Sequence, residues 1–234
     1  MPQGEQVRAM FAGIAERYDL ANRWLSFGID RGWRRALVRA AEREHPRTVV
    51  DLATGSGDVA FALRRRLGAG TAIAGMDFCQ PMLDEAEQKQ ADRPERDQVA
   101  FRPGDCLNLP LDDASTDVLT IAFGLRNLED RHHGLTEMRR ALRPGGVLLV
   151  LEFTQPAAWL RPFYYCYLKH VLPRLAAWLT RDRSAYEYLA GSIEAFPTKE
   201  SLSEEMRAAG FDPVEARGMT GSIVALHAAR KPAS

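Results

Sequence analysis

The chain has 234 residues, of which 46% are hydrophobic and 26% are charged, with 18 glycines and 13 prolines. These values are ordinary for a folded protein with a sizeable core, and they exclude disordered and fibrous classes. Lysine and arginine together number 31, and so do aspartate and glutamate, which gives a formal net charge of zero. No general basic field is therefore present to favour nucleic acid as the principal partner.

Cysteine usage and hydropathy indicate the compartment. The cysteines Cys79, Cys106 and Cys166 have no paired spacing and predict neither a disulfide framework nor a zinc site. The first residues contain no apolar run typical of a signal peptide, and no stretch approaches the roughly 18–20 apolar residues of a membrane span. We therefore expect a cytoplasmic protein, for which contact with a membrane surface stays open.

A helical segment precedes the first strand signal. Residues 5–42 carry apolar side chains at helical spacing, which predicts a cap of two or three short helices over residues 1–45. From Thr48 onward, short apolar runs alternate with helical stretches, a pattern typical of a parallel sheet with crossover helices. The expected strands are Thr48–Ala53, Thr71–Asp77, Val99–Arg102, Val118–Phe123 and Val147–Phe153, and the expected helices are Asp58–Leu67, Gln80–Gln90 and Asp130–Leu142. This series predicts a doubly wound α/β sheet over residues 46–154.

The alternation stops after Thr154. Nine of the 20 aromatic residues lie between Trp159 and Phe196, and we expect a helical insertion over residues 155–198. A helix at Lys199–Ala209 then leads to two final strands, Phe211–Arg217 and Ser222–Ala228. Because only four residues separate these strands, they are expected to pair antiparallel. The prediction is one α/β domain whose sheet is mostly parallel, with the last strand antiparallel.

A glycine turn follows the first expected strand. Asp51 lies near the end of that strand, and Gly55, Ser56 and Gly57 lead into the next helix. Glycines let a ligand approach the backbone, and a helix N-terminus presents unpaired N–H donors. Taken alone, Gly55-x-Gly57-x-x-Ala60 fits either a loose dinucleotide fingerprint or a tight turn without a ligand.

Acidic side chains follow three successive strands, at Asp51, Asp77 and Asp105. The carboxyl ends of parallel strands converge on one edge of a sheet, so these groups are expected to lie near one another. A carboxylate at Asp77 can accept both hydroxyls of a ribose, and Asp105 or the neighbouring amide at Cys106 can read an adenine edge. Each acid alone is more simply a solvated loop residue, but the three together predict a nucleoside site.

Two motifs extend this interpretation to a class of enzymes. The stretch Gly104–Asp117 resembles the segment after the third strand in class I S-adenosylmethionine-dependent methyltransferases, a pattern that dehydrogenases lack. The turn at Asp51–Gly57 and the run Arg143–Gly146 extend the resemblance over residues 48–154. It implies S-adenosylmethionine as the cofactor, with the following cofactor-binding residues: Asp51, Gly55, Ser56, Gly57, Asp77, Asp105 and Cys106.

A narrower resemblance spans nearly the whole chain. Tyr18–Trp33, Phe123–Asn127, Arg140–Thr154, Tyr186–Leu189 and Ile193–Pro197 are similar to segments of the menaquinone and ubiquinone C-methyltransferase family. This resemblance implies C-methylation of a reduced polyprenyl quinone, with demethylmenaquinol converted to menaquinol as the main interpretation. The alternatives are a polyprenyl-methoxy-benzoquinol in ubiquinone biosynthesis, another small phenolic acceptor and, from a different class, a nicotinamide-dependent oxidoreductase.

Methylation of a ring carbon requires the neighbouring hydroxyl to lose its proton, and a phenol with a pKa of about 10 is rarely ionised at neutral pH. We expect Arg126, just past the fourth strand, to stabilise the developing phenolate and Asn127 to orient it. A structural salt bridge is the alternative role of Arg126. The proposed proton acceptors are Asp19 and Asp30, with Tyr18 as a relay. Asp30 stands where the family usually has histidine, and this departure puts an imidazole role at that position in doubt.

Further departures and the insertion complete the sequence-based expectations. Ala21 stands where the family usually has methionine, and Ala122 replaces a serine that often contacts the cofactor. The aromatic insertion either covers a polyprenyl tail at a membrane-facing mouth or packs as core or as a homodimer interface. No metal site is expected, because the adjacent His132 and His133 point about 100° apart on a helix.

Overall fold

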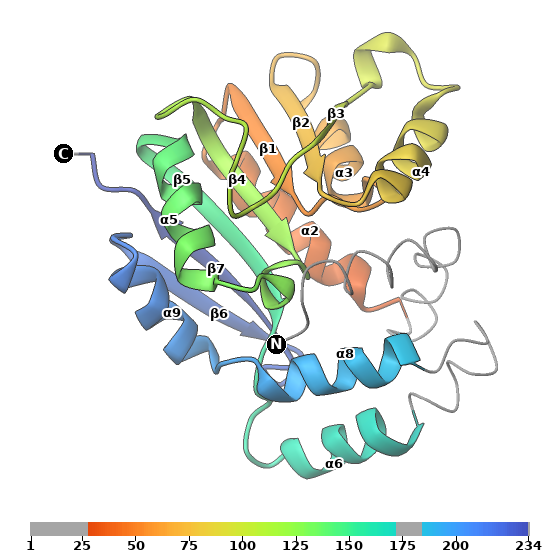
Figure 1. Cartoon of the computed structure of the whole chain (residues 1–234), viewed down its shortest axis with the longest axis vertical. Coiled ribbons are helices and arrows are strands. Elements are labelled where there is room, and N and C mark those ends of the chain that lie inside the picture. Colours follow the sequence, from red (N-terminus) through yellow and green to blue (C-terminus); the bar gives the residue numbers. More distant parts are fainter. Residues whose placement is uncertain (1–27, 172–183, 234) are drawn as a thin grey trace.

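A seven-stranded sheet with helices on both faces forms the centre of the protein (Figure 1). The structure is a computed structural model that describes residues 28–171 and 184–233. Tyr18 and Asp19, with most of the expected N-terminal cap, lie outside the described residues. The strands are β1 (Thr48–Leu52), β2 (Ala72–Asp77), β3 (Ala100–Pro103), β4 (Thr116–Ala122), β5 (Leu142–Phe153), β6 (Val214–Met219) and β7 (Val224–Arg230).

The described helices connect and cover these strands. The α-helices are α2 (Asp30–Arg43), α3 (Asp58–Leu67), α4 (Gln80–Gln90), α5 (Arg131–Ala141), α6 (Arg161–Cys166), α8 (Ser184–Ala195) and α9 (Lys199–Ala208). Short 3₁₀ turns occur at η1 (Glu95–Asp97) and η2 (Leu125–Asn127), and a π-helical turn follows α6 at η3 (Tyr167–Val171). None of the helices in the described ranges has the length and hydrophobicity that crossing a bilayer requires.

The strand order β3-β2-β1-β4-β5-β7-β6 confirms the predicted architecture. Strands β1 to β5 pair in parallel, whereas β7 runs antiparallel to both β5 and β6. The chain leaves β1 towards β2 and β3 on one side and returns to β4 on the other. The carboxyl ends of β1 and β4 therefore border a topological switch point, where α/β sheets bind their ligands.

Two expected boundaries were wrong. The strand expected to begin at Val147 begins at Leu142, and β5 includes the run Pro144-Gly145-Gly146. The Gly145 N–H donates to the Lys231 carbonyl over 2.9 Å, and the Lys231 N–H donates to the Gly146 carbonyl over 2.9 Å. Pairing with the C-terminal segment, together with a register shift against β4, extends the strand backwards.

The final turn also lies later than expected. Strand β6 continues through Gly218 to Met219, and the reversal occurs at Thr220, Gly221 and Ser222, all of which have positive φ. The Ile223 N–H donates to the Thr220 carbonyl over 3.2 Å and closes this turn. The antiparallel pairing itself is confirmed.

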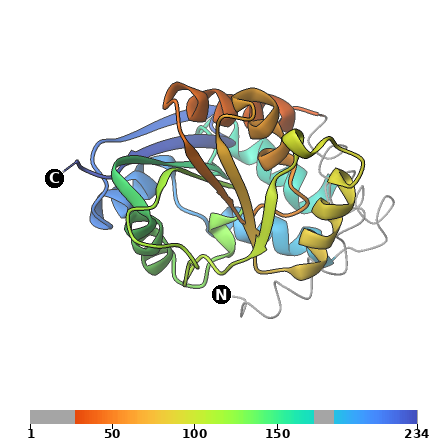
Figure 2. The ribbon, with the colours of Figure 1, turned by 90° about the horizontal axis from the view of Figure 1, so that it is seen from above.

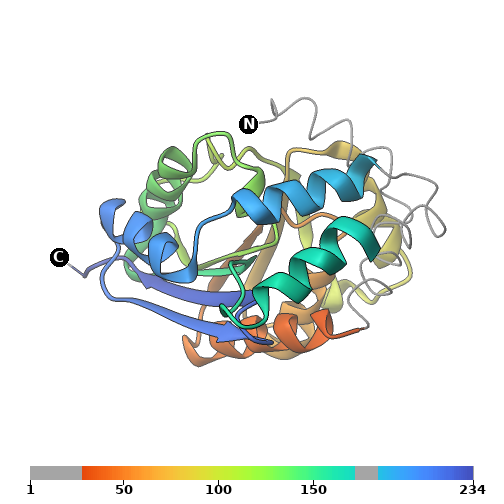
Figure 3. The same ribbon diagram turned by 90° about the horizontal axis from the view of Figure 1, so that it is seen from below.

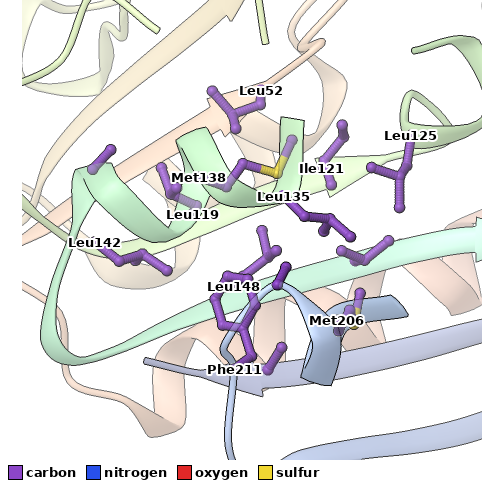
Figure 4. Packing of buried hydrophobic residues seen from close by; sticks show 14 of the residues in the cluster. Leu52, Leu119, Ile121, Leu125, Leu135, Met138, Leu142, Leu148, Met206 and Phe211 are labelled. Carbon is purple, nitrogen blue, oxygen red and sulfur yellow. The ribbon is translucent and has the colours of Figure 1, made fainter. Parts of the chain in front are cut away.

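Helices cover both faces of the sheet (Figure 2), and apolar side chains on both faces are buried beneath them. On one face α5 and α9 contribute buried side chains, and on the other α2 and α3 do so. Figure 4 shows the first cluster, in which Leu135 and Met138 of α5 meet Leu148 of β5 and Phe211 after α9. A strand that is buried on both faces carries apolar side chains along its length, and its polar side chains lie chiefly at its ends. The candidate functional residues therefore gather at the edge of the sheet where the strands end.

The insertion lies at the carboxyl edge of the sheet. Helices α6 and α8 run side by side across that edge (Figure 3). Leu168 of η3 and Ile193 of α8 are buried and pack with Phe153 at the end of β5. The insertion therefore covers the edge at which the predicted site residues gather.

Candidate active site

A cavity of about 550 Å³ opens at the carboxyl ends of β1, β2 and β4. It brings together most of the residues that the sequence predicts for the site. The predicted residues that line it are Asp51, Gly55, Ser56, Asp77, Asp105, Cys106 and Asn127. The nucleoside site expected at the strand ends thus corresponds to a single hollow.

The glycine turn between β1 and α3 shapes one wall of the cavity. Gly55 and Gly57 have φ values of 57° and 84°, in the region that side chains disfavour. A Cβ atom on Gly57 would lie 2.8 Å from the Phe101 ring, and one on Gly55 would lie 3.1 Å from Met82 Cε. Gly57 does not line the cavity but begins α3, so its role is to bring the helix N-terminus close to the site.

Asp77, at the end of β2, holds the turns on either side of it. Its Oδ2 accepts the Gly55 N–H over 2.8 Å, and its Oδ1 accepts the Cys79 N–H over 2.9 Å. Burial raises the pKa of this carboxyl, and the backbone hydrogen bonds oppose the rise. A carboxylate has about four acceptor positions, so the group can still accept a hydrogen bond from a ribose.

Asp51, at the end of β1, is a second buried carboxylate in the cavity wall. The hydroxyls of Thr54 and Thr120 donate to it over 2.6 and 2.5 Å. Burial nevertheless raises its pKa to about 6. A cation bound in the cavity would favour the ionised form.

Asp105 and Cys106 form the wall after β3. The Asp105 Oδ1 accepts the Leu107 N–H over 2.9 Å, which fixes this turn locally. Burial raises the pKa of the Cys106 thiol to about 12, so the thiol stays neutral and is not a nucleophile near neutral pH. Apolar side chains of Phe78, Met82 and Leu107 line the same part of the cavity and provide surfaces for a flat ring.

Arg126, in η2 after β4, forms a buried ion pair. Its side chain is 3% exposed, and its Nη1 lies 2.9 Å from Oε1 of Glu152, which is 1% exposed. The guanidinium also donates to the Phe123 carbonyl. Arg126 is not among the cavity-lining residues, so in this structure it anchors η2 to the end of β5.

Asn127, next to Arg126, does line the cavity. Tyr188 of α8 donates its hydroxyl to Asn127 Oδ1 over 3.0 Å, which leaves the amide NH₂ of Asn127 as a donor. Burial raises the pKa of Tyr188, so the hydroxyl remains a donor. The sequence interpretation included Tyr188 and Glu152 in motifs but gave them no role. Glu152 could have been found from the sequence, because it is a carboxylate that follows the apolar run of β5.

Asp30, the predicted proton acceptor, begins α2 and lies outside the cavity lining. Its Oδ2 is 3.9 Å from Arg34 Nε. Arg34 does line the cavity and pairs with Asp58, another lining residue, and the sequence interpretation missed both. Arginine spacing on α2 gave no signal, because the partner lies on a different helix.

Comparison with known proteins establishes the family. The ubiE/COQ5 methyltransferase family model matches residues 2–231. The chain belongs to this family. A demethylmenaquinone methyltransferase of Deinococcus radiodurans is 48% identical over 210 residues, 89% of this chain and 86% of that protein. The Thermus thermophilus protein of the same name is 43% identical, and the alignment covers 95% of this chain and 100% of that protein.

A further family member, the ubiquinone/menaquinone biosynthesis C-methyltransferase UbiE of Geobacter sp., is 39% identical, covering 98% of this chain and 97% of its own. Among solved structures, the [4+2]-cyclase SpnF superposes with a TM-score of 0.69 at 18% identity, over 100% of this chain and 98% of its own. An S-adenosylmethionine-dependent methyltransferase of Thermotoga maritima gives 0.62 at 20% identity, covering 94% and 99% of the two chains.

These findings confirm the predicted family and the predicted class I methyltransferase fold. They also remove the nicotinamide-dependent oxidoreductase as an interpretation. The match to a cyclase shows that the fold alone does not fix the reaction. In this member of the ubiE/COQ5 family, the reaction has to be argued from the cavity.

The carboxylate of Asp51 makes the stability of the apo-protein depend on pH. Its pKa rises from 3.8 to about 6 on folding, so the folded state holds this proton more tightly. Proton binding at Asp51 therefore stabilises the folded state fully below pH 3.8, and this stabilisation is lost as pH rises through about 6. The free energy of unfolding falls by about 3 kcal/mol over that range. Urea unfolding of the wild type and Asp51→Asn at each pH should show the wild type losing this amount relative to the variant.

The matched control is Asp92→Asn, which removes an exposed carboxylate just after α4. Its unfolding free energy should follow the wild type across the same pH range. Parallel curves for the wild type and Asp51→Asn would contradict the buried charge at Asp51.

Proposed function

We propose that this enzyme transfers a methyl group from S-adenosylmethionine to a ring carbon of reduced demethylmenaquinone and so produces menaquinol. The observation that carries the proposal is the Asp77 carboxylate, held by the Gly55 and Cys79 amides at the wall of the cavity. The names of the Deinococcus and Thermus relatives support naphthoquinol as the acceptor. The benzoquinol of ubiquinone biosynthesis is the second acceptor to test, because the Geobacter relative is named for both pathways.

The donor set of the cavity fits S-adenosylmethionine. Asp77 accepts a hydrogen bond from the ribose, and Asp105 with the Cys106 amide meets the adenine between Phe78 and Met82. When bound, the cofactor supplies an electrophilic methyl group on a positively charged sulfur. The buried Asp51 carboxylate matches the positive charge of the cofactor, and this attraction lowers the pKa of Asp51 when the cofactor is bound.

The acceptor ring belongs on the side of the cavity lined by Gly124, Asn127 and Leu128. There the Asn127 amide, oriented by Tyr188, donates to the ring oxygen and stabilises its developing negative charge. Asp30, Asp19 and Tyr18 stay proposed participants in removal of the hydroxyl proton.

The decisive experiment incubates the purified chain with labelled S-adenosylmethionine and each reduced acceptor. We expect one labelled methyl group on the carbon ring of demethylmenaquinol, identified by mass spectrometry of the product. Asp77→Ala should weaken cofactor binding at least tenfold, because it removes a hydrogen bond between the ribose and a charged group. Methylation of only the benzoquinol would replace the naphthoquinol assignment, and transfer to neither acceptor would contradict the proposed function.

Arg126 is proposed to stabilise the phenolate in addition to pairing with Glu152. Arg126→Met alone leaves the Glu152 charge buried and should cost about 3–5 kcal/mol of stability. The double variant Arg126→Met/Glu152→Gln removes both charges and keeps an acceptor for one of the two backbone N–H groups that Glu152 holds, so part of that stability should return. If Arg126 acts in the transition state, kcat of the folded double variant falls while its cofactor Kd is unchanged. A kcat equal to wild type would remove Arg126 from the mechanism.

Membrane contact is proposed for the outer face of α6 and the turn that precedes it. Trp159 and Phe163 are each 72% exposed and four residues apart, with exposed Arg161 between them. The inward aromatic residues Tyr164 and Tyr165 pack instead around Leu168 and Ile193. The aromatic insertion is therefore divided between a packed inner face and an exposed outer face, which suits an enzyme whose acceptor carries a polyprenyl tail.

Flotation with neutral phosphatidylcholine vesicles tests this contact. Burying one large apolar side chain contributes about 1.5–3 kcal/mol, so Trp159→Ser/Phe163→Ser should weaken vesicle binding at least tenfold. Ile29→Ser, which changes an exposed apolar residue before α2, is the control and should float with the wild type. Equal flotation of the Trp159→Ser/Phe163→Ser variant and the wild type would contradict contact through α6.

A further inference from the structure

A second hollow lies beside the candidate active site, between α2 and α3, with a volume of about 540 Å³. Five arginines line this α2/α3 groove: Arg31, Arg34 and Arg35 from α2, and Arg65 and Arg66 from α3. The acidic residues of the lining are Asp30 and Asp58. The groove therefore has an excess of positive charge in a protein whose formal net charge is zero.

The available carboxylates do not neutralise this charge. Arg34 pairs with Asp58 and approaches Asp30, so one guanidinium engages both acids of the lining. Arg66 pairs with Glu42 over 2.8 Å. The other three arginines are exposed and form no ion pair with any residue in the described part of the chain: Arg31, Arg35 and Arg65.

Helix packing holds these guanidinium groups near one another. Arg31 and Arg35 are one turn apart on α2, an arrangement in which like charges repel. Buried Trp33, Leu37 and Phe61 belong to the apolar cluster of α2 and α3, so the two helices stay together despite this repulsion. A bound anion would relieve the repulsion by accepting hydrogen bonds from both helices.

We propose that the α2/α3 groove binds a phosphate-bearing anion. The planar guanidinium donates two parallel N–H groups, which match the oxygen spacing of a phosphate. The hollow is large enough to admit a phosphate group together with the molecule that carries it. A phospholipid headgroup and a free organic phosphate share this chemistry, and experiment distinguishes the two sources.

The groove and the active-site cavity share a wall. Arg34 and Asp58 line both hollows, and Lys89 Nζ lies 3.9 Å from Asp58 on the active-site side. Arg35 and Arg65 line only the groove. Substitutions at these two positions therefore test the anion site without altering the lining of the cofactor cavity, and the proposal does not depend on the proposed methyl acceptor.

The first experiment is calorimetric titration of the full chain with pyrophosphate at low salt. Arg35→Glu/Arg65→Glu should weaken binding about a hundredfold, since two charge-assisted contacts are lost. Arg217→Glu, a single substitution of the same kind at an exposed position on β6, is the control and should bind like the wild type. Unchanged cofactor affinity in the groove variant verifies that it is folded.

The second experiment is flotation with phosphatidylglycerol vesicles, using the same three proteins. Vesicle binding that Arg35→Glu/Arg65→Glu reduces and Arg217→Glu does not assigns the groove to a lipid headgroup. Pyrophosphate binding that the groove variant loses, together with vesicle binding that it retains, assigns the groove to a free phosphate compound. The proposal is overturned if the wild type binds neither probe. It is also overturned if the groove variant binds both probes as tightly as the wild type does.

Discussion

The carboxylate of Asp77 is the constraint on which the candidate active site depends. One of its oxygens holds the glycine turn after β1, and the other holds the start of α4 after β2. Two separate βα connections are thereby fixed to a single charged group at the sheet edge. The left-handed conformations of Gly55 and Gly57 then bring the N-terminus of α3 against the same cavity.

Placing two carboxylates in this wall has an electrostatic cost. Burial raises the pKa of both Asp51 and Asp77, although each accepts two hydrogen bonds or more. A buried carboxylate with a raised pKa is characteristic of functional sites rather than of packing. A positively charged ligand would offset the cost, so the same two groups that destabilise the empty cavity favour a sulfonium cofactor.

The sequence allowed prediction of the features that depend on local pattern. Apolar runs gave the strands, and the acids after them identified the edge where Asp51, Asp77 and Asp105 meet. Contacts between distant segments had no such signal. The pairing of Arg126 with Glu152 joins η2 to β5, and the start of β5 at Leu142 depends on backbone pairing with Lys231. Both are decided by tertiary packing, which a strand or turn propensity does not contain.

The zero net charge conceals a separation of charge within the molecule. Carboxylates gather in the cavity at the strand ends, and arginines gather in the groove between α2 and α3. Arg34 and Asp58, which pair with each other, stand at the boundary between the two regions. An anion that binds Arg34 in the groove competes with Asp58 for it and so changes the charge facing the cofactor cavity. Because such coupling is reciprocal, the cofactor would change the affinity of the groove for its anion by the same factor.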